Sequence, residues 1–180
     1  MKLFLSRRSP GMRSGMTLVE IMVATAVGSI AMAAIMSLWL YSARSFVAMG
    51  NYADLDRASR NALDLMSREI RGTRSLREFS TNRLQFEDFD GSSLTFSYSP
   101  GSRELIREKG TTNRTVLLEQ CDFLAFHVSQ RNPSNDFTFY PTTVASQAKL
   151  IDVSWRCSRE ILGARVNTES VQTAKIVTRN

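Results

Sequence analysis

The sequence predicts an α+β fold, in which a long N-terminal helix with a membrane-spanning first half packs on an antiparallel β-sheet head. Residues 21–43 contain no charged side chain. A run of about 23 such residues is long enough to cross the hydrocarbon core of a bilayer as a helix. From residue 76 onward, apolar and polar residues alternate between turn residues. This period of two is typical of half-buried strands.

A short basic segment precedes the apolar run. Residues 1–15 hold no acid and four basic side chains, Lys2, Arg7, Arg8 and Arg13. By the positive-inside rule these bases would keep the segment in the cytoplasm. In a secretory signal the apolar region is shorter and precedes the cleavage site. Here a cut at the end of the basic segment, after Gly15, would lie before the apolar region. The helix would then remain on the mature protein.

The stretch from Gly15 to Glu20, with the sequence GMTLVE, resembles the N-terminus of type IV prepilins and of type II secretion pseudopilins. The shared pattern is a basic leader ending in glycine, a hydrophobic first mature residue, then Thr, Leu, an aliphatic residue and Glu. Met16 stands where the family usually has Phe. The resemblance implies a pilin-like fold, cleavage between Gly15 and Met16 by prepilin peptidase, and N-methylation of Met16.

Glu20 is the one acid at the start of the apolar helix. A carboxylate in a membrane segment is costly and is by default a functional residue with a partner. The resemblance implies that Glu20 pairs with the N-terminal amine of a neighbouring subunit during assembly. The alternative is an acid that merely reaches back to the cytoplasmic headgroups.

After Arg44 the helical pattern becomes amphipathic. Apolar residues recur at steps of three, four or seven, at Leu55, Ala62, Met66 and Ile70. Such a stripe predicts a helix face that packs against the head. We therefore expect a leader at 1–15, a membrane half at 16–44, an amphipathic half at 45–75 and a β-rich head at 76–180.

Residues 60–71, the strands after them and residues 177–180 are similar to minor pilins of the PilW type and pseudopilins of the GspJ type. This resemblance implies a minor pilin or pseudopilin in a type IV pilus or type II secretion pseudopilus, with a periplasmic head on a single-pass inner-membrane anchor. The implied partners are prepilin peptidase, other minor and major pilins or pseudopilins, the inner membrane and its assembly platform. The alternatives are a DNA-uptake pilin and a membrane-anchored periplasmic enzyme or receptor.

Cys121 and Cys157 both fall in the head that is expected to be exported. An even number of cysteines in an oxidising compartment favours a disulfide, which would close a loop of about 35 residues and stabilise the fold by about 3–4 kcal/mol. The alternative is two buried thiols that act as small apolar side chains. Two cysteines and one histidine fall short of a four-ligand zinc site, so no metal or cofactor is expected.

Catalytic motifs are absent from the sequence: it has no Gly-rich phosphate loop, nucleophile elbow or HExxH, and we expect no enzyme. His127, the only histidine, alternates within a predicted strand and is expected to be a hydrogen-bonded structural residue. The acids Glu87, Asp88 and Asp90 could supply part of a calcium site, and the alternative is a solvated hairpin turn.

The net charge of +6 does not indicate nucleic-acid binding. Removal of residues 1–15 would leave 19 bases against 17 acids, which is nearly balanced. A nucleic-acid-binding domain typically carries a strong excess of bases. Nucleic acid is therefore not expected as a partner.

Overall fold

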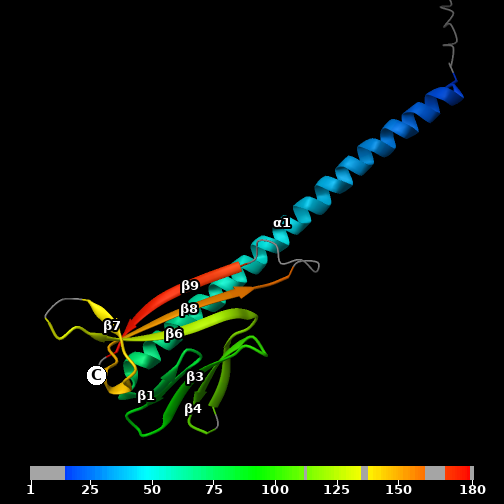
Figure 1. The fold of residues 1–180 in the computed structure, drawn as a ribbon. Coiled ribbons are helices and arrows are strands. Elements are labelled where there is room, and N and C mark those ends of the chain that lie inside the picture. Colours follow the sequence, from blue (N-terminus) through cyan, green and yellow to red (C-terminus); the bar gives the residue numbers. More distant parts are fainter. Residues whose placement is uncertain (1–14, 112, 135–137, 161–168, 179–180) are drawn as a thin grey trace, which may run out of the picture. The chain divides into compact units, whose positions relative to one another are not determined.

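The computed structural model describes residues 15–111, 113–134, 138–160 and 169–178 (Figure 1). The chain divides into two compact units, residues 1–43 and 44–180. Helix α1, Leu18–Gly72, begins in the first unit and ends in the second. The described strands all lie in the second unit, so the α+β fold class is confirmed.

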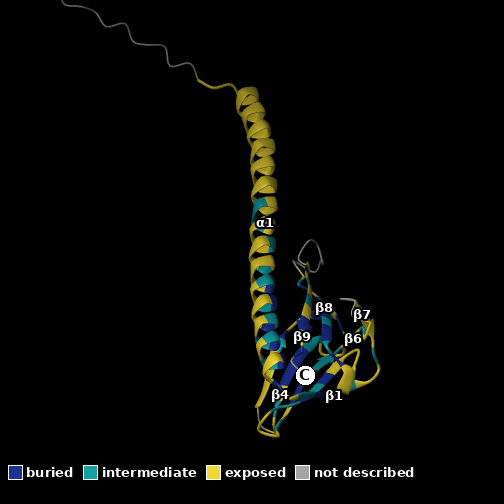
Figure 2. Cartoon of the chain, turned by 90° about the vertical axis from the view of Figure 1, so that its left-hand side faces the viewer, coloured by how far each residue is buried: buried dark blue, intermediate teal, exposed yellow. Residues whose placement is uncertain are grey.

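The part of α1 in the first unit is apolar on all sides. Every residue from 18 to 41 is exposed within the chain, as Figure 2 shows in yellow. Three hydroxyls there, those of Thr25, Ser29 and Ser37, donate to carbonyls three or four residues earlier, at 2.7–3.0 Å. These side chains are thus hydrogen-bonded without water, as a helix in hydrocarbon requires. The helix is long and apolar enough to cross a membrane.

The part of α1 in the second unit buries one stripe. The buried residues are Leu55, Ser59, Ala62, Met66 and Ile70. The four apolar members confirm the predicted stripe, whereas the polar Ser59 was not predicted. The helix ends at Gly72, and it continues through Gly50 without interruption.

The first sheet is a meander of consecutive antiparallel strands. Its strands are β1 (Ser75–Ser80), β2 (Arg83–Glu87), β3 (Ser93–Ser99), β4 (Glu104–Lys109) and β5 (Asn113–Leu118), in that spatial order. The turn at Asp90-Gly91 lies between β2 and β3, and Gly91 has a φ of +78°. Glycine suits that turn because other residues rarely adopt such an angle.

The second sheet follows a different order, β7-β6-β8-β9. Its strands are β6 (Cys121–Arg131), β7 (Phe139–Pro141), β8 (Leu150–Ser158) and β9 (Glu169–Val177). All neighbours are antiparallel. Between β6 and β8 lie β7 and the short 3₁₀ helix Ala145–Gln147. The described strands of the head therefore form two sheets, whereas the sequence predicted only an antiparallel β-sheet head.

One hydrophobic core joins the second half of α1 to both sheets (Figure 2). Met66 from the helix, Phe86 and Phe96 from the first sheet and Trp155 from the second are each at most 1% exposed. The rings of Phe86 and Phe96 meet edge to face, with centroids 6.4 Å apart. The Trp155 Nε1–H donates to the buried Ser59 Oγ at 3.2 Å, which satisfies both polar groups within the core.

Candidate functional site

The start of α1 is a reciprocal capping arrangement. The Thr17 backbone N–H donates to Glu20 Oε2 at 3.4 Å, and the Glu20 N–H donates to Thr17 Oγ1 at 3.3 Å. This is the capping box that Thr-x-x-Glu forms at a helix N-terminus. Gly15 and Met16 consequently precede the helix, and Met16 is 70% exposed. The predicted scissile peptide therefore lies in non-helical, accessible chain.

Glu20 lies both at the N-terminus of α1 and at the start of its apolar segment. It lies in the first helical turn, where the helix dipole favours a negative charge. It also begins a segment whose other polar side chains bond within the helix. The sequence identified Glu20 as the exceptional charge, but it did not identify Thr17 as its hydrogen-bond partner in the same chain. The basic residues that were predicted to hold the leader in the cytoplasm lie outside the described residues; they are Lys2, Arg7, Arg8 and Arg13.

In the head, one polar link joins α1 to the first sheet. Arg107 of β4 donates through Nε to Glu69 Oε2 at 2.8 Å and through Nη2 to Glu69 Oε1 at 2.6 Å. The two side chains are only 11% and 19% exposed. Arg107 also donates to Asn113 Oδ1 at 3.2 Å. A bidentate, mostly buried pair of this kind fixes the position of the helix on the sheet.

Two pairs of opposite charges are spaced four residues apart on the second half of α1. Asp56 and Arg60 form an ion pair of 2.9 Å. Asp64 and Arg68 have the same spacing, but they do not pair in the described part of the chain. Asp56 also accepts a bond from Gln172 of β9 at 3.2 Å. Of these two equivalent local spacings, the one whose acid also has a tertiary partner forms the ion pair.

The two cysteines lie opposite each other across β6 and β8. Both are buried and both are free thiols in this structure. A hydrogen bond from the Cys157 thiol lowers the pKa of Cys121, and the same bond raises the pKa of Cys157. The nearby Tyr98 hydroxyl donates to the Cys121 carbonyl at 2.9 Å, and burial raises the pKa of Tyr98. The predicted pair is thus brought together, and its disulfide remains a prediction.

Beside the cysteines lies a polar cluster that the sequence did not predict, formed by Arg103, Gln120, Asp122 and Ser158. The Arg103 guanidinium is paired with the Asp122 carboxylate. It also donates to the carbonyls of Gln120 and Ser158, at 3.4 and 3.5 Å. The Ser158 hydroxyl donates to Asp122. We call these four residues the Arg103 clasp.

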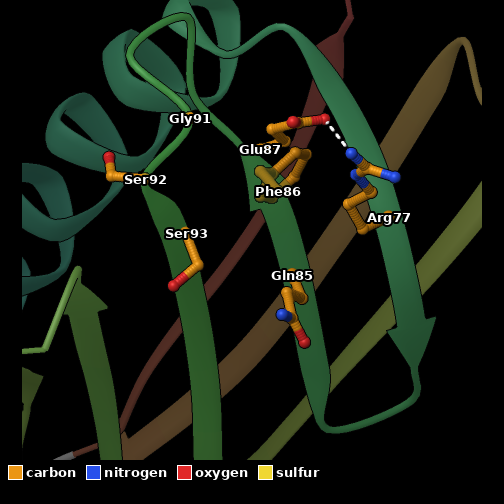
Figure 3. A pocket seen from close by; sticks show the side chains of 7 residues that line it. All are labelled: Arg77, Gln85, Phe86, Glu87, Gly91, Ser92 and Ser93. Carbon is orange, nitrogen blue, oxygen red and sulfur yellow. Dashed lines mark ion pairs between the residues drawn. The ribbon is translucent and has the colours of Figure 1, made fainter.

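The predicted acidic cluster is occupied by contacts within the protein. Glu87 pairs with Arg77 at 2.5 Å, beside a cavity of about 160 Å³. Figure 3 shows this pair among the residues that line the cavity. Asp88 pairs with Lys109 at 2.7 Å, and this contact lowers the pKa of Asp88 and raises that of Lys109. Hydrogen bonds from Ser92 lower the pKa of Asp90. Among the described residues no group of three or more potential ligands could hold a metal ion.

His127 lies on the outer face of the second sheet, opposite Asp152 of β8. It borders a cavity of about 470 Å³ between the end of β1 and β6. Its imidazole is exposed and makes no hydrogen bond in the part of the chain that the structure describes. The expectation of a hydrogen-bonded structural histidine is therefore wrong, because β6 turns this residue outward.

Comparison with known protein families identifies the N-terminal segment. Residues 11–36 match the family described as the prokaryotic N-terminal methylation motif. No match was found among curated proteins or among solved structures. The matched range includes the capped helix start and the first part of the apolar run. The chain is thus prepilin-like at its N-terminus, and the motif implies processing by prepilin peptidase and assembly with other pilins. The apolar helix is consistent with membrane anchoring.

Proposed function

We propose that this protein is a minor pilin or pseudopilin, a structural subunit that joins or initiates a type IV pilus or type II secretion pseudopilus. The observation that carries the proposal is the methylation motif at residues 11–36, followed directly by an exposed apolar helix on the same chain as a β-sheet head. In this proposal the leader stays in the cytoplasm, α1 anchors the subunit in the inner membrane, and the head lies in the periplasm.

The proposed assembly step uses Glu20. In the uncleaved chain its carboxylate accepts the Thr17 N–H, a weak bond of 3.4 Å. An unpaired carboxylate at the centre of a membrane helix costs about 2.5–3.5 kcal/mol on insertion scales, and less toward its end. Cleavage creates an amine at Met16, and the amine of a neighbouring subunit can then neutralise Glu20. Pairing would therefore couple processing to assembly and set the axial register between subunits.

Processing is tested by replacing the glycine at the cut. Gly15→Val should block leader removal, because the resemblance implies a peptidase pocket that accepts little side chain there. Gly28→Val is the matched control, since the space around Gly28 is open. The leader of this variant should be removed normally. Mass spectrometry of membrane-extracted protein should show wild type and Gly28→Val beginning at N-methylated Met16. An intact leader on wild-type protein, in cells that contain the peptidase, would refute the proposal.

Assembly is tested with two substitutions at Glu20. Glu20→Gln removes the charge but can still close the capping box, whereas Glu20→Ala removes both. Both variants should be cleaved and inserted, and both should lose crosslinks to partner pilins at matched protein levels. If Glu20→Gln behaves like wild type while Glu20→Ala does not, the residue acts as a helix cap only. Unchanged crosslinking and an unchanged phenotype in both would favour a simple membrane anchor.

A further inference from the structure

We propose that Cys121 and Cys157 form a modification site that is oxidised to a disulfide only while the adjoining ends of β6 and β8 are open, before the Arg103 clasp closes over it. The co-reactant is an exported disulfide-bearing oxidant. The proposed function is what would bring the head into contact with such an oxidant in the cell. The oxidation of the two cysteines, and its timing before the Arg103 clasp closes, depend only on the residues of the head.

The backbone presents the two cysteines to each other. The Cys121 N–H donates to the Arg103 carbonyl at 2.8 Å, away from β8, while the Ser158 N–H donates to the Gln120 carbonyl at 3.1 Å. This pattern identifies Cys121 and Cys157 as a non-hydrogen-bonded antiparallel pair. The Cα atoms of such pairs are about 4.5 Å apart, within the range that a disulfide spans. The bond can therefore form without a change of register.

The exchange uses the two sulfurs in turn. With the strand ends open, the Cys121 thiol loses its proton and becomes a thiolate. That thiolate attacks one sulfur of the oxidant, forming a mixed disulfide and releasing the other sulfur as a thiolate. Cys157 then loses its proton and attacks the Cys121 sulfur, displacing the second oxidant sulfur. The chain gives up two protons and two electrons, and the oxidant is reduced to two thiols.

Burial closes the site in the folded head. Cys121 is 0% exposed and Cys157 is 1% exposed, so a disulfide reagent has no direct path to either sulfur. In the Arg103 clasp the Arg103 guanidinium bonds to Gln120 and Asp122, which flank Cys121, and to Ser158, which follows Cys157. Opening these strand ends requires this network to break. Oxidation is therefore fast during folding and slow afterwards, when it waits for local opening.

The test uses full-length protein in detergent, with oxidised glutathione as the probe. One sample is unfolded, reduced and refolded with the probe, and another is folded in the reduced state before the probe is added. Free thiols are counted by maleimide labelling under denaturing conditions. Refolding should yield the disulfide, and the folded protein should react on the order of tenfold or more slowly. Equal rates, or free thiols after oxidative refolding, would overturn the proposal.

Variants then test the clasp. Ser158→Ala and Asp122→Asn should accelerate oxidation of the folded protein severalfold toward the refolding rate, because each removes a bond that holds the strand ends together. Lys175→Ala is the control, since it removes a 4.0 Å contact with Asp152 on the same sheet, away from the cysteines. If the clasp variants match Lys175→Ala, the Arg103 clasp does not gate the site. If a clasp variant fails to fold, the wild-type comparison still decides the order of events.

Discussion

Helix α1 carries apolar side chains on every side between residues 18 and 43, but mainly on one stripe between residues 55 and 70. In the first segment Val23, Met32 and Leu38 are each more than half exposed. In the second segment Leu55, Met66 and their neighbours enter the core of the head. One continuous helix therefore leaves its apolar side chains exposed in the first segment and buries them in the head in the second.

The difference separates two kinds of mutational effect. A residue of the first segment affects what the protein associates with, namely the membrane and neighbouring subunits in the proposed function. A residue of the second segment affects whether the head folds. The same substitution should therefore change the stability of the head when it lies in the second segment and leave that stability unchanged when it lies in the first.

The largest effect is expected at Met66. Met66→Ala should destabilise the head by roughly 2–5 kcal/mol, because it removes a fully buried side chain and leaves a cavity. Met32→Ala makes the same chemical change at a position that is 61% exposed, and it should leave head unfolding unchanged. Denaturant unfolding of full-length protein in detergent, followed by tryptophan fluorescence, measures both. Equal losses would show that the two segments do not differ as described.

A smaller but distinct loss is expected at the link between helix and sheet. Glu69→Ala leaves the mostly buried Arg107 without its carboxylate, which should cost about 3 kcal/mol, the low end for a broken buried ion pair. Asp64→Ala is the control, because Asp64 lies on the exposed face of the same helix. Its effect on the unfolding midpoint should stay within about 0.5 kcal/mol. A comparable loss for Asp64→Ala would contradict the assignment of Glu69.

The link between helix and second sheet is tested by a double-mutant cycle. Ser59→Ala leaves the buried Trp155 N–H unpaired and should cost about 1–3 kcal/mol. Trp155→Phe removes the N–H together with part of the ring. The double variant should lose less stability than the sum of the two single variants, because no orphaned donor remains. Strict additivity in thermal unfolding would show that the 3.2 Å contact contributes nothing.

The smallest effect concerns the Asp88–Lys109 pair. Lys109 lowers the pKa of Asp88 in the folded protein below its ordinary 3.8. The pair therefore stabilises the folded head above pH 3.8, and this contribution is lost as the pH falls through the pKa that Asp88 has in the folded protein. Asp88→Asn should therefore flatten the acid limb of the melting temperature against pH. At neutral pH the shift should be small, since Asp88 and Lys109 lie at the surface. An unchanged acid limb would mean that the pair makes no net contribution.

The sequence predicted much of this fold because its strongest signals are local. The uncharged run, the stripe at Leu55, Ala62, Met66 and Ile70, and the Asp90-Gly91 turn are all recognisable within short windows. Each corresponds to a feature of the structure. The division of the head into two sheets was not recognisable, because alternation specifies a strand but not its neighbour. The methylation motif is likewise a local pattern, and the family comparison matches it.

The sequence alone therefore determined the prepilin-like start, the apolar segment, the apolar members of the helix stripe and the presence of two cysteines in the head. Only the tertiary structure decided which polar groups are buried and which groups are their hydrogen-bond or ion-pair partners. Ser59 meets Trp155 across 96 residues of sequence, and Glu69 meets Arg107 across 38. Periodicity reports which face of an element is apolar, but a buried polar side chain is stable only beside its partner. That partner is supplied by a distant segment whose position depends on the whole fold.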